Sequence, residues 1–371
     1  MTLDRTSLPP MDVADRAGRL RAALGDADCD ALLVTSLTNI RYLTGFTGSA
    51  ALLLVGPDRL VFVTDGRYRD QSAAELAAAG VGADIEIGRT SDDQRDVLTK
   101  AAGAVDRLGL EADHVTWAQQ QRYAGEWFPG AEVVATTGLV EELRLVKDAG
   151  EVARIEAACG IADAALATVR PRLGDGATEA EIALDLEWHM RRLGAEGPSF
   201  DTIVASGPNG AKPHHRAGDR RIGEGDLVVI DFGALVDGYH SDMTRTVVVG
   251  EPDATQRRML AVVAESQAAG VAAVRAGVEA QAVDDSCRRV IRDAGWGDAF
   301  VHGTGHGVGL DIHESPRLST TPTGRLADGQ IVTVEPGVYL AQHGGVRIED
   351  TVVVTADGCR TLTRAPKEPA L

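Results

Sequence analysis

Two stretches of the chain alternate apolar and polar positions as paired β-strands do, and both carry acidic side chains. The first, DLVVIDFGALVDGYHSDMTRTVVVG, predicts strands over 227–234 and 239–249, joined by a loop that contains an Asp-Gly pair. If residues 235–238 form a four-residue loop, Asp231 faces Asp242. Two like charges directly opposite each other repel. The pattern therefore predicts either a divalent cation between the carboxylates or two solvated aspartates on an exposed face.

The second stretch, IVTVEPGVYL followed closely by GGVRIEDTVVVT, has the same alternation. It predicts strands over 331–340 and 344–355, and a short loop between them places Glu335 opposite Glu349. Arg347 precedes Glu349 by two residues and therefore lies on the same face of its strand. Two hairpins that each direct a carboxylate pair to one face are hard to attribute to chance, and we interpret them as one binding site.

The chain before residue 140 alternates predicted strands and helices, which favours an α/β domain. Residues 39–49, rich in Gly and Thr, are predicted to form a loop. The helix that starts at Ser91 is expected to use that serine as its N-cap. The predicted strands cover 31–36, 50–56, 59–64, 84–89 and 107–112, and the predicted helices cover 13–24, 65–80 and 91–104.

The rest of the chain predicts two helices followed by strands, and then the same order again. Thr178 is the predicted N-cap of the second helix. We therefore expect an α+β domain built from two similar halves. The four helices are predicted over 149–169, 179–193, 254–276 and 279–294.

Length and composition narrow the function. A chain of 371 residues is expected to form two domains. Its 55 acidic and 37 basic residues give a net charge of −18, which argues against nucleic acid and against an anionic membrane surface as partners. No apolar run approaches the about 18 residues of a membrane span. The four cysteines lack metal-site spacing and indicate reduced thiols, so we expect a cytoplasmic protein.

Histidines complete the candidate site. His302, His306 and His313 fall within twelve residues of a chain that holds nine histidines. His306 lies in the Gly-rich segment HGTGHGVGL, where backbone can approach closely, and we expect it to add a nitrogen ligand. Four carboxylates and one imidazole suit two divalent ions, with Mn²⁺ favoured and Fe²⁺, Co²⁺ or Zn²⁺ left open. Two such ions about 3.5–4 Å apart would bind a bridging water and lower its pKa.

These residues resemble a known family. The motifs DFG…SDMTRT, HGTGHGVGLDIHESP, TVEPGVY and GVRIEDT are similar to those of the "pita-bread" metallopeptidases, which include aminopeptidase P, prolidase and methionine aminopeptidase. The segment NIRYLTGFTGS…TDGRY is similar to the creatinase-type N-terminal domain of the proline-specific members. The resemblance implies an α/β N-terminal domain over 1–142. It also implies an α+β pita-bread catalytic domain over 143–371, with a curved antiparallel sheet.

The resemblance also implies roles for single residues. Glu335 would take the proton of the bridging water in addition to binding metal. His214, rather than its neighbour His215, and His313 would bind the substrate carbonyl or the tetrahedral intermediate. The implied dinuclear metal ligands are Asp231, Asp242, His306, Glu335 and Glu349.

Four more positions match the substrate side of the family's site. His302 and Tyr339 match positions near the substrate. The alternatives are a backbone-capping role for His302 and core packing for Tyr339, which is the more usual role of a tyrosine at a strand end. Arg347 would orient a ligating carboxylate or neutralise the acidic cluster. Arg317 is a candidate for binding the substrate's C-terminal carboxylate, with an ordinary surface arginine as the alternative.

The implied activity is hydrolysis of the bond between an N-terminal residue and a following proline in short peptides. We expect an Xaa-Pro aminopeptidase, with an Xaa-Pro dipeptidase (prolidase) as the alternative. The arginine-bearing insertion of eukaryotic-type prolidases is missing between His313 and the TVEPG strand. Other hypotheses are a metal-free creatinase-like hydrolase, a methionine aminopeptidase and a non-catalytic peptide-binding module. The resemblance further implies a homodimer.

Overall fold

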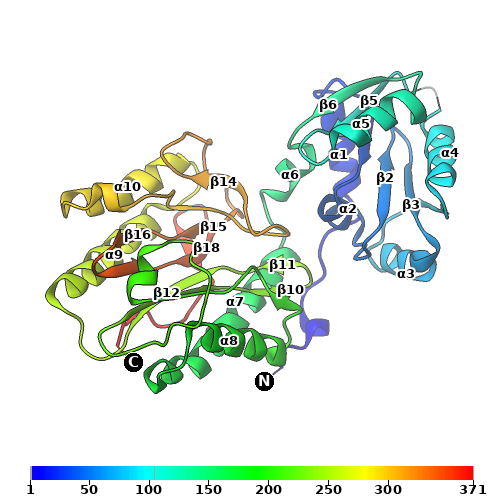
Figure 1. Cartoon of the computed structure of the whole chain (residues 1–371). Helices are drawn as coiled ribbons and strands as arrows, with labels where there is room; N and C mark the ends of the chain where they lie inside the picture. Colours follow the sequence, from blue (N-terminus) through cyan, green and yellow to red (C-terminus); the bar gives the residue numbers. More distant parts are fainter. Residues whose placement is uncertain (1, 104, 371) are drawn as a thin grey trace. The chain divides into compact units, whose positions relative to one another are not determined.

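The computed structural model describes residues 2–103 and 105–370 of the chain (Figure 1). It divides into two compact units, Met11–Arg144 and a second unit that joins Met1–Pro10 to Leu145–Leu371. The first ten residues were expected in the first domain. They belong to the second unit, where the Leu3 amide donates to the carbonyl oxygen of Leu193 at 2.8 Å. Leu193 is the last residue of the helix Glu179–Leu193.

The first unit is built on one six-stranded mixed sheet with the order β4-β3-β2-β1-β5-β6. β3–β4, β1–β5 and β5–β6 are parallel, whereas β1–β2 and β2–β3 are antiparallel. The strands are β1 (Ala31–Val34), β2 (Ala51–Val55), β3 (Leu60–Thr64), β4 (Asp84–Ile87), β5 (Arg107–Glu111) and β6 (Glu132–Thr136). The helices are α1 (Arg16–Leu24), α2 (Leu37–Thr44), α3 (Arg69–Ala78), α4 (Ser91–Ala102), α5 (Trp117–Arg122) and α6 (Leu139–Arg144), with short turns η2 (Gly66–Tyr68) and η3 (Tyr123–Trp127). The short turn η1 (Arg5–Ser7) belongs to the second unit.

Helix α2 corrects the sequence analysis, which expected a loop over 39–49. The Ser36 side chain caps the first turn by accepting from the Asn39 amide, and Gly45, with φ of 75°, ends the helix after two turns. Both end signals are present in the sequence, but the stretch is too short for a clear helical period.

Helix α4 also differs from its prediction. Its N-cap is Thr90, one residue earlier than expected, because Thr90 and Asp93 form a reciprocal capping box. The expected end of this helix at Ala104 lies outside the described residues.

The second unit repeats the order of two helices and several strands, as predicted. Its helices are α7 (Ala149–Val169), α8 (Glu179–Leu193), α9 (Ala254–Ala273) and α10 (Ala280–Asp293), with short turns η4 (Arg170–Asp175), η5 (Gly207–Ala211) and η6 (Gly297–Ala299). Its strands are β7 (Gly197–Pro198), β8 (Ile203–Ser206), β9 (Leu227–Phe232), β10 (Ala234–Val236), β11 (Tyr239–His240), β12 (Met243–Val248), β13 (Gly305–Gly307), β14 (Glu314–Leu318), β15 (Ile331–Val334), β16 (Gly337–Leu340), β17 (Gly344–Arg347), β18 (Asp350–Val354) and β19 (Cys359–Thr361).

All the strand pairs within the sheets of the second unit are antiparallel. One apolar cluster joins α7 and α8 to β8, β9 and β12, and a second joins α9 and α10 to β15, β17 and β18. Each helix pair therefore buries its apolar side against its own group of strands, and the acidic site residues lie on those strands or directly beside their ends.

The turn of the first hairpin is shorter than predicted. Asp237 and Gly238 have φ of 47° and 72°, so both adopt the left-handed conformation of a two-residue type I′ turn. Val236 and Tyr239 pair on either side of it. The right-handed twist of the strands favours this turn over the expected four-residue loop.

The shorter turn changes which residues face each other. Thr244, not Asp242, pairs with Asp231. Asp242 is a diagonal neighbour of Asp231, still within reach across the ladder. The strand is interrupted at Gly233, where a Cβ atom would come within 1.8 Å of the Ser241 carbonyl oxygen. The direct pairing of the two aspartates was therefore wrong, although both remain in one hairpin.

The register of the second hairpin is confirmed. Val334 pairs with Asp350 in β15 and β18, and β16 and β17 continue the same register beyond them. Glu335 and Glu349 lie between these two paired segments and so face each other.

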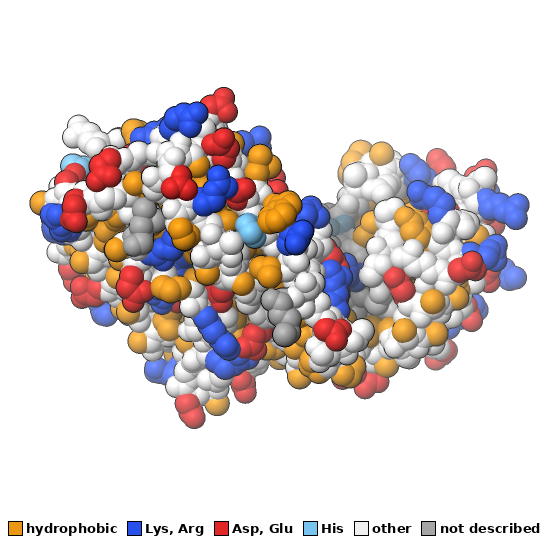
Figure 2. All heavy atoms as spheres, turned by 90° about the horizontal axis from the view of Figure 1, so that it is seen from below, with side chains coloured by type: hydrophobic (Ala, Val, Ile, Leu, Met, Phe, Trp, Pro, Cys, Tyr) orange, Lys and Arg blue, Asp and Glu red, His pale blue; other side chains and the backbone are white. Residues whose placement is uncertain are grey.

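The surface carries charges of both signs. Figure 2 shows Lys and Arg side chains interspersed with Asp and Glu over the face drawn, rather than gathered into a patch of one sign. Within 2–103 and 105–370, no helix combines the length and the apolar character that crossing a bilayer requires. All four cysteines are free thiols.

Core packing generates a stability prediction at Gly270 in α9. A Cβ atom there would lie 2.3 Å from Cys287 Sγ and 2.7 Å from Val334 Cγ1. We expect Gly270→Ala to lower the free energy of unfolding by about 1–3 kcal/mol, because overpacking outweighs the helix propensity gained. The matched control is Gly160→Ala in α7, where nothing lies within 4 Å. Chemical denaturation should show that Gly160→Ala keeps or raises the free energy of unfolding. A Gly270→Ala protein with the wild-type free energy of unfolding would contradict the close packing at Gly270.

Candidate metal centre

Side chains from both hairpins line a cavity of about 910 Å³ in the second unit. The apolar lining residues include Ala183, Leu184 and Phe200, from α8 and the segment that follows it. Most of the predicted site lines the same cavity. The charged and titratable lining side chains are Asp201, Asp231, Asp242, Glu187, Glu335, Glu349, His214, His215, His302, His306, His313, Arg216, Arg317 and Arg347.

Three of the carboxylates converge closely. One oxygen each of Asp231, Asp242 and Glu349 lies within 4.8 Å of the others. Asp231 Oδ1 and Glu349 Oε1 are buried, and neither has a hydrogen-bond partner among the described residues. Buried acceptors normally have partners, so these two oxygens require a group that donates or bears positive charge.

His306 contributes its nitrogen to the same place. Its Nδ1 lies 2.9 Å from the carbonyl oxygen of Gly307, which fixes Nδ1–H as the donor and leaves a lone pair on Nε2. That Nε2 is 3.5 Å from Asp242 Oδ2 and 3.5 Å from Glu335 Oε1. The flanking glycines are needed, because a Cβ at Gly305 would lie 2.0 Å from the Thr333 carbonyl oxygen.

Burial and mutual repulsion alter the protonation of these groups. Burial raises the pKa of Glu335 to about 8. Burial, and then the neighbouring carboxylates, raises the pKa of Asp242 and of Glu349 well above the usual range. Burial lowers the pKa of His306 to about 3, so this ring is neutral near pH 7. Without cations the carboxyls bind protons, whereas with cations they are free to ionise.

Arg347 neutralises part of the acidic cluster from behind. It is 2% exposed, and its Nη2 donates to Asp231 Oδ2 at 2.6 Å. Its Nε donates to Thr244 Oγ1, and Thr244 donates in turn to Glu349 Oε2 at 2.8 Å. Arg347 thus orients two carboxylates, one directly and one through a threonine.

Tyr339 and His302 extend this chain. Arg347 Nη1 donates to Tyr339 Oη at 2.8 Å, and Tyr339 Oη is 2.8 Å from His302 Nε2. His302 lines the cavity, but Tyr339 is absent from the lining residues. Tyr339 connects two cavity residues, and its predicted place near the substrate stays a prediction. Burial lowers the pKa of His302 to about 4.

Three further histidines and an arginine line the cavity, namely His214, His215, His313 and Arg317. The rings of His306 and His313 meet edge to face, with centroids 4.4 Å apart. Partial burial, and then the charge of Arg317, lowers the pKa of His313. Among the described residues, no hydrogen bond or ion pair engages the Arg317 guanidinium. His215 Nε2 lies 2.8 Å from Glu179 Oε2, which leaves His214 as the neighbour without that restraint.

Comparison with known proteins identifies the family. Residues 153–356 match the model of metallopeptidase family M24, and residues 16–146 match the creatinase/prolidase N-terminal domain. The chain belongs to family M24. The predicted fold is thereby confirmed: an α/β N-terminal domain and a pita-bread domain with antiparallel sheets.

Similar M24 proteins match the chain over almost its full length. The chain is 35% identical to an Xaa-Pro dipeptidase of Pyrococcus furiosus over 95% of this chain and 99% of that protein. A solved Xaa-Pro dipeptidase from Bacillus anthracis has a TM-score of 0.92 and 38% identity, covering 96% and 99% of the two chains. A solved X-Pro aminopeptidase from Thermotoga maritima has a TM-score of 0.87 and 35% identity, covering 96% and 100%.

M24 membership implies a dinuclear divalent metal site in this enzyme. The chemistry present fits such a site: converging carboxylates, two buried oxygens without partners, and an imidazole with its lone pair directed at them. The oxygen-rich donor set suits hard divalent ions and not a closed thiolate zinc site.

Two contributors were missed from the sequence of this M24 enzyme. Thr244 joins Arg347 to Glu349, and Glu179 binds the segment around His214. The capping box at Thr178 placed Glu179 in the first turn of α8, but only the fold shows that its carboxylate is buried.

The crowded carboxylates generate a prediction about metal content. We expect Asp242→Ala to lose bound divalent metal together with activity, because the remaining acidic groups no longer enclose the cation. Mass spectrometric metal analysis of purified protein checks this. Asp298→Ala, which removes an exposed aspartate outside the cavity, is the matched control and should retain metal. Full metal content in Asp242→Ala would exclude Asp242 as a ligand.

Proposed function

We propose that this M24 enzyme is an Xaa-Pro dipeptidase. The observation that carries the proposal is the Arg317 guanidinium, which faces the cavity without an ion-pair partner among the described residues. Burial lowers the pKa values of His306 and His313, and the positive charge of Arg317 adds to both shifts. Arg317 therefore acts within electrostatic range of the metal centre. A dipeptide substrate carries its own carboxylate next to the scissile bond, and an unpaired guanidinium is suited to bind it.

The relatives support the same choice. The sequence analysis favoured an aminopeptidase, but the named relatives and solved structures are mostly Xaa-Pro dipeptidases. Similarity to the Thermotoga X-Pro aminopeptidase keeps that activity as the second candidate. The two activities differ in which part of the substrate lies near Arg317. In a dipeptide it is the proline carboxylate, and in a longer peptide it is the next residue of the substrate.

The metal ligands remain a proposal. Two divalent ions bound here would supply Lewis acidity at the scissile carbonyl and a water acidified enough to attack it near neutral pH. Mn²⁺ is the favoured metal because the donors are mainly carboxylate oxygens. The proposed ligands are Asp231, Asp242, His306, Glu335 and Glu349.

The other residues would move protons and stabilise charge. Glu335 accepts the proton that the attacking water loses and delivers it to the proline nitrogen as the C–N bond breaks. That nitrogen belongs to a tertiary amide without N–H. His214 and His313 donate hydrogen bonds to the oxyanion that forms on the carbonyl. Arg347 keeps Asp231 oriented throughout.

Substrate length tests the proposal directly. We expect hydrolysis of Xaa-Pro dipeptides in preference to Xaa-Pro-Yaa tripeptides, abolished by a chelator and restored by Mn²⁺. Arg317→Met should raise KM for the dipeptide about 10–100-fold, since a charge-assisted hydrogen bond contributes about 1.5–3 kcal/mol. Arg292→Met, on an exposed arginine outside the cavity, is the control. A preference for tripeptides, or an unchanged KM in Arg317→Met, would favour the aminopeptidase.

A substitution at His313 tests whether this residue acts in catalysis or in metal binding. His313→Ala is expected to lower kcat about 100-fold, as loss of an oxyanion donor does, while metal content stays near normal. Steady-state kinetics and metal analysis on the same preparation check both. Parallel loss of metal and activity would instead make His313 a ligand.

The homodimer implied by the family resemblance stays a prediction. Sedimentation at micromolar concentration tests it, and a protein that remains monomeric would refute it.

A further inference from the structure

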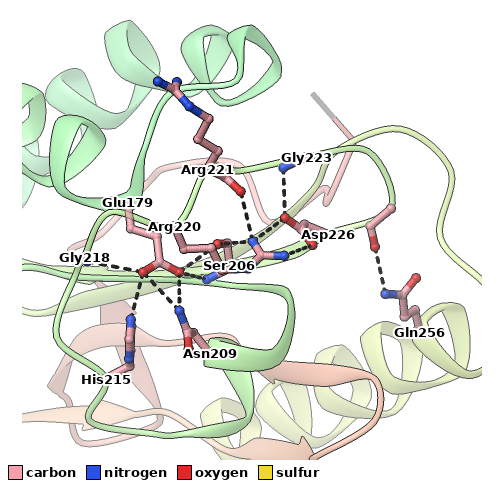
Figure 3. Close-up of polar contacts among 11 residues, drawn as sticks. Glu179, Ser206, Asn209, His215, Gly218, Arg220, Arg221, Gly223, Asp226 and Gln256 are labelled. Atoms are coloured by element: carbon pink, nitrogen blue, oxygen red, sulfur yellow. Dashed lines mark hydrogen bonds and ion pairs between the residues drawn. The ribbon is translucent and has the colours of Figure 1, made fainter.

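The segment that carries His214 is held by a buried carboxylate outside the cavity. We call residues 207–218 the His214 loop. It follows β8 and begins with the turn η5. His214 and His215 both line the cavity, whereas Glu179, in the first turn of α8, does not. Figure 3 shows the Glu179 carboxylate surrounded by donors from the two ends of this loop.

Glu179 is 0% exposed and accepts from four residues. Its Oε1 accepts from the amide and the hydroxyl of Ser206, at 2.8 and 2.7 Å, and from Asn209 Nδ2 at 3.1 Å. Its Oε2 is 2.8 Å from His215 Nε2 and accepts from the Gly218 amide at 3.3 Å. One carboxylate thus joins the residue before the loop to the last residue of the loop.

The charge state of Glu179 is consistent with this role. Burial alone would raise its pKa, but the hydrogen bonds from Ser206, Asn209 and His215 outweigh it and lower the pKa. An ionised carboxylate only accepts, so His215 must donate from Nε2. The ring of His215 therefore has one defined orientation, with Nε2 directed at Glu179.

A second contact fixes the residue on the other side of His214. Arg347 Nη1 donates to the carbonyl oxygen of Pro213 at 3.4 Å. The start of the loop also packs backbone to backbone on β17, because a Cβ at Gly345 would lie 1.9 Å from the Gly210 carbonyl oxygen. His214 is thus bracketed by Pro213, bound to Arg347, and by His215, bound to Glu179.

The base of the loop has its own anchor. Arg220 forms a two-pronged ion pair with Asp226, at 2.6 and 2.9 Å, and Arg220 Nη1 also contacts Ser206 Oγ (Figure 3). Because Ser206 donates to Glu179 as well, the anchor and the carboxylate share one residue. The restraint on the loop is therefore a connected set of buried polar contacts and not a single bond.

We propose that Glu179 is a positioning residue that acts through His215 to aim the His214 imidazole at the reacting carbonyl. This rests on the proposed function, in which His214 stabilises the oxyanion. The carboxylate neither touches the substrate nor binds metal. Its effect is on catalysis because an oxyanion donor works only within a narrow range of positions.

A double-mutant cycle tests the proposal. In Glu179→Gln the new amide presents N–H groups to donors that the carboxylate accepted from, so part of the loop's restraint is lost. We expect kcat for the Xaa-Pro dipeptide to fall about 10–100-fold with little change in KM. Metal content should stay near normal. In a His214→Ala background, adding Glu179→Gln should lower kcat no further than about 2-fold, because the two residues act on one step.

Matched controls separate positioning from general damage. Glu151 is also a buried glutamate in the first turn of a helix, α7, and accepts from Tyr239 Oη at 2.9 Å. Glu151→Gln should leave kcat within about 2-fold of the wild type. If Glu179→Gln does not fold, His215→Phe removes the Nε2–H donor and enters the same cycle with His214→Ala.

The outcomes are distinguishable. If the wild-type enzyme is active and the double mutant loses kcat by the product of the two single-mutant factors, Glu179 and His214 act independently. That result would overturn the positioning role and leave the proposed function intact. A wild-type turnover rate in Glu179→Gln, or in His215→Phe if that variant is used, would do the same. A wild-type enzyme that cleaves no Xaa-Pro peptide would overturn the proposed function, and the positioning role with it.

Discussion

The mutual repulsion of buried carboxylates is the constraint on which the second unit depends. Asp231, Asp242 and Glu349 bring oxygens within 4.8 Å of one another, and two of those side chains have buried oxygens without partners among the described residues. Arg347 offsets part of this charge through Asp231. The remainder is offset by protons or by cations, and the neutral, preoriented imidazole of His306 favours cations.

Buried polar side chains behind the site maintain its geometry. Thr244 donates to Glu349, and Thr351 Oγ1 donates to the Asp242 carbonyl oxygen at 2.7 Å. Arg245 is buried between them and pairs with Asp350 at 2.9 Å. Residues that sit next to the proposed ligands in the chain are therefore bound to neighbouring strands. Such support would preorganise the proposed ligands before any cation arrives.

Much of the site follows from local rules. Side chains alternate strictly along a strand, so the position of the loop in the second hairpin was enough to predict that Glu335 faces Glu349. The register of the strand pairs on both sides of these two residues confirms it. The first hairpin was placed correctly but paired wrongly, because a choice between two and four loop residues shifts the partner of Asp231 from Asp242 to Thr244. Helix α2 was missed since its two turns are too short to show a period.

By itself the sequence determined the α/β and α+β order of the two units and the two hairpins that carry the carboxylates, because these depend on periodicity and neighbouring residues. His214 and His313 were placed in the cavity by the family resemblance. Only the tertiary structure decided the partners of the site residues. Arg347 binds Asp231 from 116 residues away, and Glu179 holds His215 from 36 residues away. Contacts of this range depend on how strands and helices pack, and packing leaves no periodic signal in the chain. The contact that restrains His215 and not His214 is one of these, made by a carboxylate that does not line the cavity.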